Sequence, residues 1–107
     1  MITVTIRYYG INGAPKRFVE EMIASGIVGE IRKEDGNVRY EYFVPFDSSD
    51  YILLIDSWTD QQALDKHHSL PVMQRIIALR EKYDLHMSVE KYISVETGEK
   101  DKKFIKE

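Results

Sequence analysis

Residues 57–75 read SWTDQQALDKHHSLPVMQR, and this stretch organises the rest of the chain. We expect a strand to end at Trp58, a short helix to begin at Asp60, and a second helix to begin near Pro71 with Ser69 as its cap. The stretch contains the only tryptophan and two of the three histidines. Corners between a strand and a helix are where pockets form on a rigid sheet, so we expect the functional site here.

Four segments have the sequence pattern of β-strands. Residues 2–9 and 85–95 alternate apolar and polar side chains, which predicts strands with one apolar face. Residues 38–46 are rich in aromatic side chains and predict a third strand, with a bend or an edge near Pro45. Residues 51–58 are apolar on both faces, which is typical of a strand that is covered on both sides.

A helix is expected between the first two strands. Apolar side chains recur at helical spacing from Phe18 to Ile31, and Pro15 suits the first turn. Gly26 and Gly29 weaken the helix, so we expect a kink or a break there.

The predicted order is strand, helix, strand, strand, helix pair, strand, with turns at residues 34–37 and 47–50. This order is typical of an α+β fold of the ferredoxin-like, split βαβ type, in which a four-stranded antiparallel sheet carries its helices on one face. One layer of helices covers only one side of the strand at 51–58. A second copy of the chain is therefore expected to cover the other side, and the protein is predicted to be a homodimer.

The chain has 107 residues, of which 43% are hydrophobic, and this predicts a single globular domain. We place that domain at residues 1–98 and a charged C-terminal tail at residues 99–107. The tail contains one apolar pair, Phe104 and Ile105, which is costly to leave in water. We expect the tail to dock this pair on the partner subunit; the alternative is a frayed end.

Charge and composition exclude several classes of function. A net charge of −3 gives no electrostatic footprint for nucleic acid. The absence of cysteine excludes disulfides, thiolate metal sites and cysteine nucleophiles. No apolar run reaches the ~20 residues that a membrane span needs, and the start of the chain alternates like a strand rather than a signal peptide. A cytoplasmic protein is the expectation.

Three residues at the corner are candidates for catalysis. His67 is a candidate general base, because imidazole titrates near neutral pH; the alternative is a helix histidine that bonds to the backbone. Trp58 is expected to stack on a planar aromatic substrate, to pack in the core, or both. Asp56 shares the face of Trp58, and it either orients His67, accepts a substrate hydroxyl, or pairs across strands with Arg39 or Lys91.

Five further residues are predicted to line the substrate pocket: Tyr42, Met22, Phe18, Met73 and His86. For the tyrosine the alternative is the core or the dimer seam, and for the methionines it is plain core. His68 lies about 100° round the helix from His67, so it is expected to be exposed. Adjacent helix positions point apart, so no metal site is predicted for the histidine pair.

The run LLIDSW at residues 53–58, with the residues that follow it, resembles the antibiotic biosynthesis monooxygenase family. The family's acidic residue two positions before its tryptophan matches Asp56, its tryptophan matches Trp58, and its helix histidine nine residues on matches His67. A second histidine, common in the family one residue after the proline, is replaced here by Val72.

The resemblance implies a dimeric α/β barrel and chemistry without a metal or a flavin. The haem-degrading branch of the family fits less well. It has a tryptophan where this chain has His67, and its iron-binding histidine ten residues later is Ile77 here. That branch also uses an asparagine on its first strand, where this chain offers Thr5 and Arg7.

Taken with the corner residues, the resemblance predicts an enzyme that oxidises a small aromatic quinol or phenol with O2 and uses no cofactor. His67 is the expected base, Trp58 the platform for the substrate, and Asp56 the orienting acid. The alternative is a dimeric binding protein or isomerase for a small metabolite, which uses the same pocket without oxygen. The replacement of the second histidine by Val72 favours this alternative.

Overall fold

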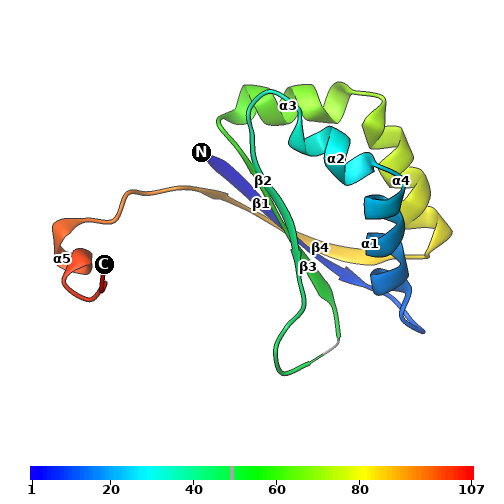
Figure 1. Ribbon diagram of the computed structural model, residues 1–107, viewed down its shortest axis with the longest axis horizontal. Helices are drawn as coiled ribbons and strands as arrows, with labels where there is room; N and C mark the ends of the chain where they lie inside the picture. Colours follow the sequence, from blue (N-terminus) through cyan, green and yellow to red (C-terminus); the bar gives the residue numbers. More distant parts are fainter. Residues whose placement is uncertain (49) are drawn as a thin grey trace.

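A computed structural model describes residues 1–48 and 50–107 as a four-stranded antiparallel sheet with helices on one face (Figure 1). The strand order is β2-β3-β1-β4. Along the chain the elements are β1 (Ile2–Tyr9), α1 (Ala14–Ala24), α2 (Ile27–Arg32), β2 (Asn37–Phe43), β3 (Ile52–Trp58), α3 (Gln61–Ser69), α4 (Val72–Lys82), β4 (His86–Ile93) and α5 (Glu99–Lys102).

The predicted α+β, ferredoxin-like fold is confirmed, with small changes at element ends. The first helix breaks where the glycines predicted it, because Gly26 takes a left-handed φ of 84° between α1 and α2. Strand β2 ends at Phe43, two residues before Pro45. The turn predicted at 47–50 includes residue 49, which lies outside the described residues.

The predicted cap of α4 was wrong. Pro71 occupies the N-cap position of α4, and Ser69 is the last residue of α3. The Ser69 hydroxyl donates to the carbonyl of Lys66 at 2.6 Å, so it satisfies the end of the preceding helix instead. The predicted start of α3 at Asp60 is confirmed. Asp60 is the N-cap residue, and its carboxylate accepts from the backbone N–H of Ala63 at 2.9 Å.

The helix-facing side of the sheet carries the core. The register places Val4 of β1 opposite Asp56 of β3, and Ile2 opposite Trp58, so these side chains share one face. This face and the helices above it bury one continuous cluster, which includes Tyr8, Phe18, Met22, Ile27, Ile31, Tyr40, Leu54, Trp58, Leu64 and Ile76.

Strand β4 is an edge strand that the helices do not cover. All of its residues are exposed in the isolated chain, including Met87 at 36% and Val89 at 56%. Both belong to the helix-facing side, because they pair with Tyr8 and Ile6 of β1. The helices therefore leave a hollow above β4, and the functional site described below lies in it.

The other side of the sheet has no helix on it (Figure 1). Leu53 and Ile55 of β3 lie half-buried on this side, since their neighbours Leu54 and Asp56 face the helices. The Thr5 hydroxyl beside them is buried without a hydrogen-bond partner among the described residues.

The turn between α2 and β2 packs tightly against the start of α3. Gly36 takes a left-handed φ of 84°, and its carbonyl accepts from the backbone N–H of Thr59 at 2.9 Å. A β-carbon at Gly36 would lie 2.5 Å from the Ala63 β-carbon and 2.8 Å from the Thr59 hydroxyl oxygen. Only glycine permits this approach, which fixes the turn relative to α3.

The C-terminal segment leaves the body of the molecule (Figure 1). After β4 the chain runs outward to α5, and no residue of α5 is buried. Phe104 is 81% exposed and Ile105 is 49% exposed, so this apolar pair is not packed on its own chain. Within the described residues, no helix has both the length and the apolar character to cross a bilayer.

Replacing Gly36 with alanine should destabilise the fold by about 2–4 kcal/mol, because the methyl group is crowded by α3 and the backbone is left-handed. The matched control is Gly29→Ala within α2, where a β-carbon meets nothing within 4 Å. That control should raise stability by about 0.5–1 kcal/mol through helix propensity. Urea unfolding of both variants measures the difference, and equal effects at the two glycines would contradict the packing argument.

Candidate functional site

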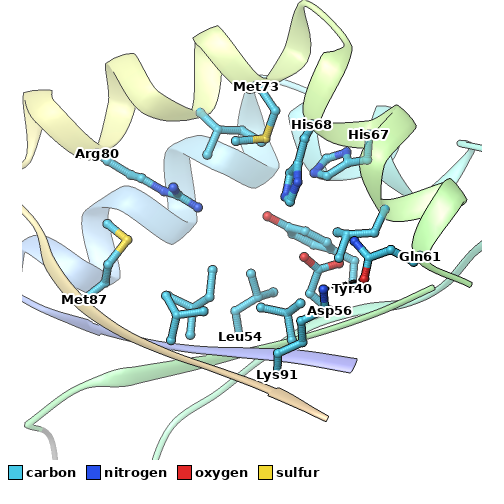
Figure 2. Close-up of a pocket in the computed structure, with 15 residues that line it drawn as sticks. Tyr40, Leu54, Asp56, Gln61, His67, His68, Met73, Arg80, Met87 and Lys91 are labelled. Atoms are coloured by element: carbon cyan, nitrogen blue, oxygen red, sulfur yellow. Dashed lines mark hydrogen bonds between the residues drawn. The ribbon is translucent and has the colours of Figure 1, made fainter. Parts of the chain in front are cut away.

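A cavity of about 450 Å³ lies between the inner face of the sheet and helices α3 and α4 (Figure 2). Its floor is apolar and comes from three strands, through Val4, Ile6, Leu54, Met87 and Val89. Polar groups enter from the walls and one end, namely Tyr40, Asp56, Gln61, His67, His68, Arg80 and Lys91. An apolar chamber with a few convergent polar groups is the usual form of a small-molecule site.

His67 of α3 is buried at the cavity wall, with 3% of its surface exposed. Its Nδ1 lies 3.0 Å from both carboxylate oxygens of Glu34. Because a carboxylate only accepts, the neutral imidazole carries its proton on Nδ1 and a lone pair on Nε2. This arrangement makes Nε2 the basic atom, and the lining position of His67 makes it available to a ligand.

Trp58 stacks against the ring of His67. The indole is fully buried, and its ring lies 4.7 Å from the His67 ring, nearly parallel at 28°. Its Nε1–H donates to Asp56 Oδ1 at 2.6 Å. Trp58 does not line the cavity, so among the two expectations for this residue the core position is the observed one.

Asp56 lines the cavity but does not contact His67 through a hydrogen bond. Burial raises the pKa of Asp56 to about 6, although the nearby His67 and the Trp58 N–H act in the opposite direction. The predicted cross-strand pairs are wrong. Arg39 lies on the other side of the sheet and pairs with Glu41 at 2.6 Å, and Lys91 binds the Gln61 side chain.

Tyr40 and His68 complete the polar wall. His68 is exposed, as expected, but it also lines the cavity, and burial together with the nearby His67 lowers its pKa. Tyr40 is 2% exposed, and burial raises the pKa of its phenol well above the ordinary value. Both groups are therefore neutral at pH 7 and able to form hydrogen bonds with a ligand.

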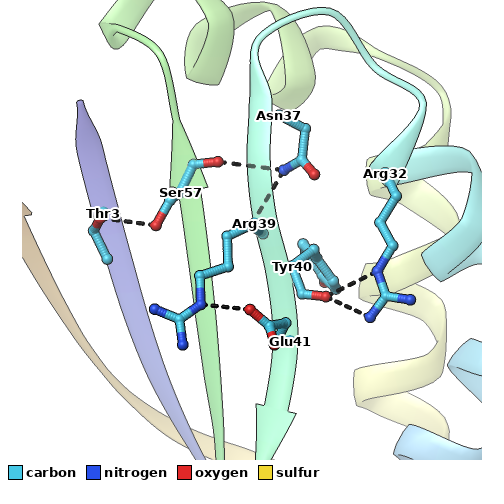
Figure 3. A network of polar contacts seen from close by, with 7 residues as sticks. All are labelled: Thr3, Arg32, Asn37, Arg39, Tyr40, Glu41 and Ser57. Atoms are coloured by element: carbon cyan, nitrogen blue, oxygen red, sulfur yellow. Dashed lines mark hydrogen bonds and ion pairs between the residues drawn. The ribbon is translucent and has the colours of Figure 1, made fainter. Parts of the chain in front are cut away.

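Strand β2 is held in place next to the cavity by contacts at its backbone (Figure 3). Arg32 of α2 donates from Nε and Nη2 to the carbonyl of Tyr40, at 3.0 and 2.7 Å. At the irregular start of β2 the Asn37 amide donates to the carbonyl of Ser57 at 3.4 Å. The Ser57 hydroxyl lies 2.8 Å from that of Thr3. These contacts tie β2 to both α2 and β3 and thereby position Tyr40.

The structure brings only some of the predicted lining residues to the cavity. Met73 of α4 lines it as predicted. Phe18 and Met22 of α1 are fully buried in the core, and Tyr42 packs edge-on against Tyr40 at 5.8 Å. These three side chains do not line the cavity.

His86 lies on the opposite side of the sheet. It pairs with Tyr9 at the end of β1, and residues at alternate positions of β4 face away from the helices. Its side chain is 81% exposed, and its nearest ionic neighbour is Asp84 at 4.0 Å. The structure therefore does not place His86 near the cavity.

Several polar groups of the site, among them Glu34 and Arg80, were not predicted from the sequence. Glu34, the partner of His67, sits in the turn after α2, at a distance of 33 residues along the chain. Arg80 is on α4, and its position in the sequence is typical of a residue on the polar face of an ordinary amphipathic helix. The turn signal at residues 34–37 located Glu34 but gave no indication of its partner.

The described residues contain no cluster of three or more histidine, aspartate or glutamate side chains that fits a metal ion. Ile77, at the position where the haem-degrading branch has its iron ligand, lies on α4 and has no ligating atom.

Comparison with known proteins places the chain in a family. The family model for antibiotic biosynthesis monooxygenases matches residues 1–79, which is most of the chain. The chain belongs to the antibiotic biosynthesis monooxygenase family. No curated protein is a significant sequence match to this member of the family.

Solved structures share the fold of this family member. A candidate antibiotic biosynthesis monooxygenase from Deinococcus radiodurans superposes with a TM-score of 0.78 at 16% identity, covering 91% of this chain and 95% of the other. SnoaB, a cofactor-independent oxygenase from Streptomyces nogalater, superposes with a TM-score of 0.72 at 20% identity, covering 90% of this chain and 94% of SnoaB. A further candidate antibiotic biosynthesis monooxygenase, from Nitrosomonas europaea, has a TM-score of 0.76 at 11% identity, covering 90% of this chain and 100% of the other. At these identities the likeness is one of fold.

The raised pKa of Asp56 predicts a pH-dependent stability. Between pH 4 and 6 the unfolded chain has released this proton while the folded chain retains it, so the contribution of Asp56 to stability falls as pH rises through this window. Asp56→Asn removes the titration and keeps an oxygen for the Trp58 N–H. The free energy of unfolding of the variant relative to the wild type should therefore increase by about 2–3 kcal/mol as the pH rises from about 4 to about 7.

Urea unfolding at a series of pH values measures this gain. Asp65→Asn, at an exposed position on α3, is the matched control and should show a much smaller change. A stability difference between wild type and Asp56→Asn that does not vary with pH would contradict the buried, proton-retaining carboxyl.

Proposed function

We propose that the protein is a monooxygenase that oxidises a small aromatic quinol or phenol with O2 and needs no cofactor. The observation that carries this proposal is the buried His67, whose Nδ1 is held by Glu34 and whose Nε2 is left as a base on an apolar chamber. Family membership gives the reaction class its support.

The first step is removal of a proton from a substrate hydroxyl. His67 Nε2 accepts the proton, and the resulting imidazolium is stabilised by the Glu34 carboxylate at 3.0 Å from Nδ1. In water a phenol gives up its proton only at high pH. A positioned base removes that requirement, and the apolar floor of Val4, Ile6 and Leu54 excludes the solvent that would compete for the proton.

The second step is transfer of electrons from the substrate anion to O2. The anion passes one electron to O2, and the two radicals combine to form a peroxide anion on the ring. This anion takes the proton back from the His67 imidazolium and becomes a hydroperoxide. Loss of water then gives the oxidised product, so that a quinol and O2 yield a hydroxyquinone and water. One oxygen atom enters the product, the other leaves in water, and the substrate supplies both electrons that this requires.

The proposed roles of two residues differ from the expectation from sequence. Trp58 acts as the platform for the His67 ring rather than for the substrate, because it lies behind that ring. Asp56 contacts Trp58 and faces the cavity, so it is proposed to receive a substrate hydroxyl while Glu34 orients His67.

A second candidate function is an isomerase or binding protein for a small metabolite. Val72, which replaces the second histidine of the family pattern, is 7% exposed and packs in the core. The buried histidine of the cavity, His67, is held by a carboxylate, and such a group is sufficient for proton transfer without oxygen. Equal turnover under air and under nitrogen would favour this candidate.

Oxygen uptake with a panel of hydroquinones tests the first proposal. The wild type should consume O2 faster than buffer, and His67→Ala should lower kcat by about 10²- to 10⁴-fold, the range for loss of a general base. Glu34→Gln should lower kcat and shift its pH profile, because the imidazolium loses its stabilising charge. An oxygen electrode measures both.

The control is Gln62→Ala, which truncates a polar side chain of α3 at an exposed position outside the cavity lining. Its rate should equal that of the wild type. Oxygen uptake that stays at the buffer rate with every hydroquinone, or that is unchanged in His67→Ala, would reject the monooxygenase proposal.

We further propose that the protein is a homodimer whose subunits meet through the helix-free side of the sheet. Leu53 and Ile55 are half-buried there, and the buried Thr5 hydroxyl has no partner within the part of the chain that the structure describes. A second copy would cover these groups. The outward-running tail would then be free to place Phe104 and Ile105 on the partner.

Light scattering should give about twice the chain mass of 12.5 kDa. Ile55→Lys should produce a monomer, because a charge placed in this interface has no partner. The control is Ile23→Lys, at a 59% exposed position on α1, which should leave the mass unchanged. Truncation after Gly98 should weaken the dimer. A stable monomer at micromolar concentration would contradict the proposal.

A further inference from the structure

We propose that Arg80 forms an anion-binding subsite in the cavity, and that the ligand carries a carboxylate or phosphate group in addition to a ring hydroxyl. The subsite itself follows from the surroundings of Arg80. The statement that the same ligand presents its hydroxyl to His67 rests on the function proposed above.

Arg80 reaches into the cavity from α4 (Figure 2). Its Nη2 donates to the Tyr8 hydroxyl oxygen at 2.9 Å. Its Nε is buried and has no hydrogen-bond partner among residues 1–48 and 50–107. No ion pair of this described part of the chain includes Arg80. A half-buried guanidinium therefore faces the chamber without a counter-charge.

This arrangement has an energetic cost that a ligand can remove. A charged group taken from water is unfavourable unless an opposite charge or full hydrogen bonding replaces the lost hydration. Three other arginines of the described residues have carboxylate partners. One of them is Arg75, on the same helix as Arg80, which pairs with Glu30 of α2 at 2.5 Å. Arg80 has no such partner, so an anionic oxygen group of a ligand can pair with its guanidinium.

Tyr8 holds the guanidinium without neutralising it. The Tyr8 side chain is fully buried, and the Arg80 Cζ lies 5.5 Å from the centre of its ring. Burial raises the pKa of the Tyr8 phenol, so this group stays neutral and leaves the charge of Arg80 uncompensated. The Nη2 donor fixes the orientation of the planar, forked guanidinium by binding Tyr8, and the remaining N–H donors are preorganised for a ligand.

The other charged groups around the chamber are already engaged. Asp56 accepts from Trp58, and Lys91 binds the Gln61 side chain. Glu34 lies behind His67 and binds its Nδ1. Lys91 also keeps its charge but is exposed to solvent, so Arg80 is the half-buried cation that remains for a ligand.

Figure 2 shows Arg80 and His67 entering the cavity from opposite sides of the view. Between them the floor is apolar, through Ile6, Leu54 and Val89. A flat ring fits such a floor, with an acid group at Arg80 and a hydroxyl at His67. The site thus selects a hydroxylated aromatic acid or phosphate ester over a neutral quinol.

Calorimetry under nitrogen with matched probes tests the subsite. The wild type should bind 2,5-dihydroxybenzoate about 10- to 100-fold more tightly than 2,5-dihydroxybenzamide, the range for a charge-assisted pair. A second arm compares 4-hydroxyphenyl phosphate with hydroquinone. Preference for the acid over the amide assigns the anion as a carboxylate, and preference for the ester over hydroquinone assigns it as a phosphate.

Arg80→Gln should abolish the preference for the anion and change the affinity for the neutral probe by less than about threefold. Arg80→Lys keeps the charge but loses the fork, so it should restore part of the preference. Arg75→Gln is the control, because it removes an arginine from the same helix outside the cavity, and it should retain the full preference. Thermal unfolding shows that each variant is folded.

Equal affinity of the wild type for the charged and neutral members of both pairs would overturn the inference. An equal loss of affinity for both members in Arg80→Gln would overturn it as well. Failure of the proposed function gives a different result, since a protein that consumes no O2 can still prefer the acid in these anaerobic measurements. Oxygen uptake with neutral hydroquinones and no anion preference would retain the function and reject the subsite.

Discussion

The burial of Trp58 is the constraint on which the site depends. A fully buried indole needs an acceptor for its N–H and a partner for its face, and this chain supplies Asp56 for the first and His67 for the second. His67 in turn is held by Glu34. This chain of contacts joins β3, α3 and the turn after α2, so the core and the candidate base are parts of the same packed unit.

The shape of the cavity follows from the unequal cover of the sheet. The helices pack over β1, β2 and β3 but leave β4 uncovered, so the apolar side chains of β4 line the open part of the cavity. Helices α3 and α4 stand at the side of this floor and direct His67 and Arg80 over it. A small fold thereby obtains an apolar chamber without a cavity in its core, where an empty volume would cost stability.

The charges of the site divide into compensated and uncompensated groups. Glu34 compensates His67, and the Trp58 N–H satisfies one oxygen of Asp56. Arg80 is fixed by a neutral phenol and keeps its full charge. This division supports a base and a separate position for an anion, and it explains why the polar groups of one small chamber do not simply pair with one another.

The sequence by itself determined the fold class and the region of the site. Period-two alternation in β1, the glycine break after α1 and the family pattern at Asp56, Trp58 and His67 are local signals, and local signals survive without coordinates. Tertiary structure decided the rest. Glu34 contacts His67 only because Gly36 lets the turn approach α3 closely. His86 lies outside the site because the strand register places its side chain on the helix-free side of the sheet. Contacts between residues far apart in sequence depend on packing, and no spacing along the chain encodes them.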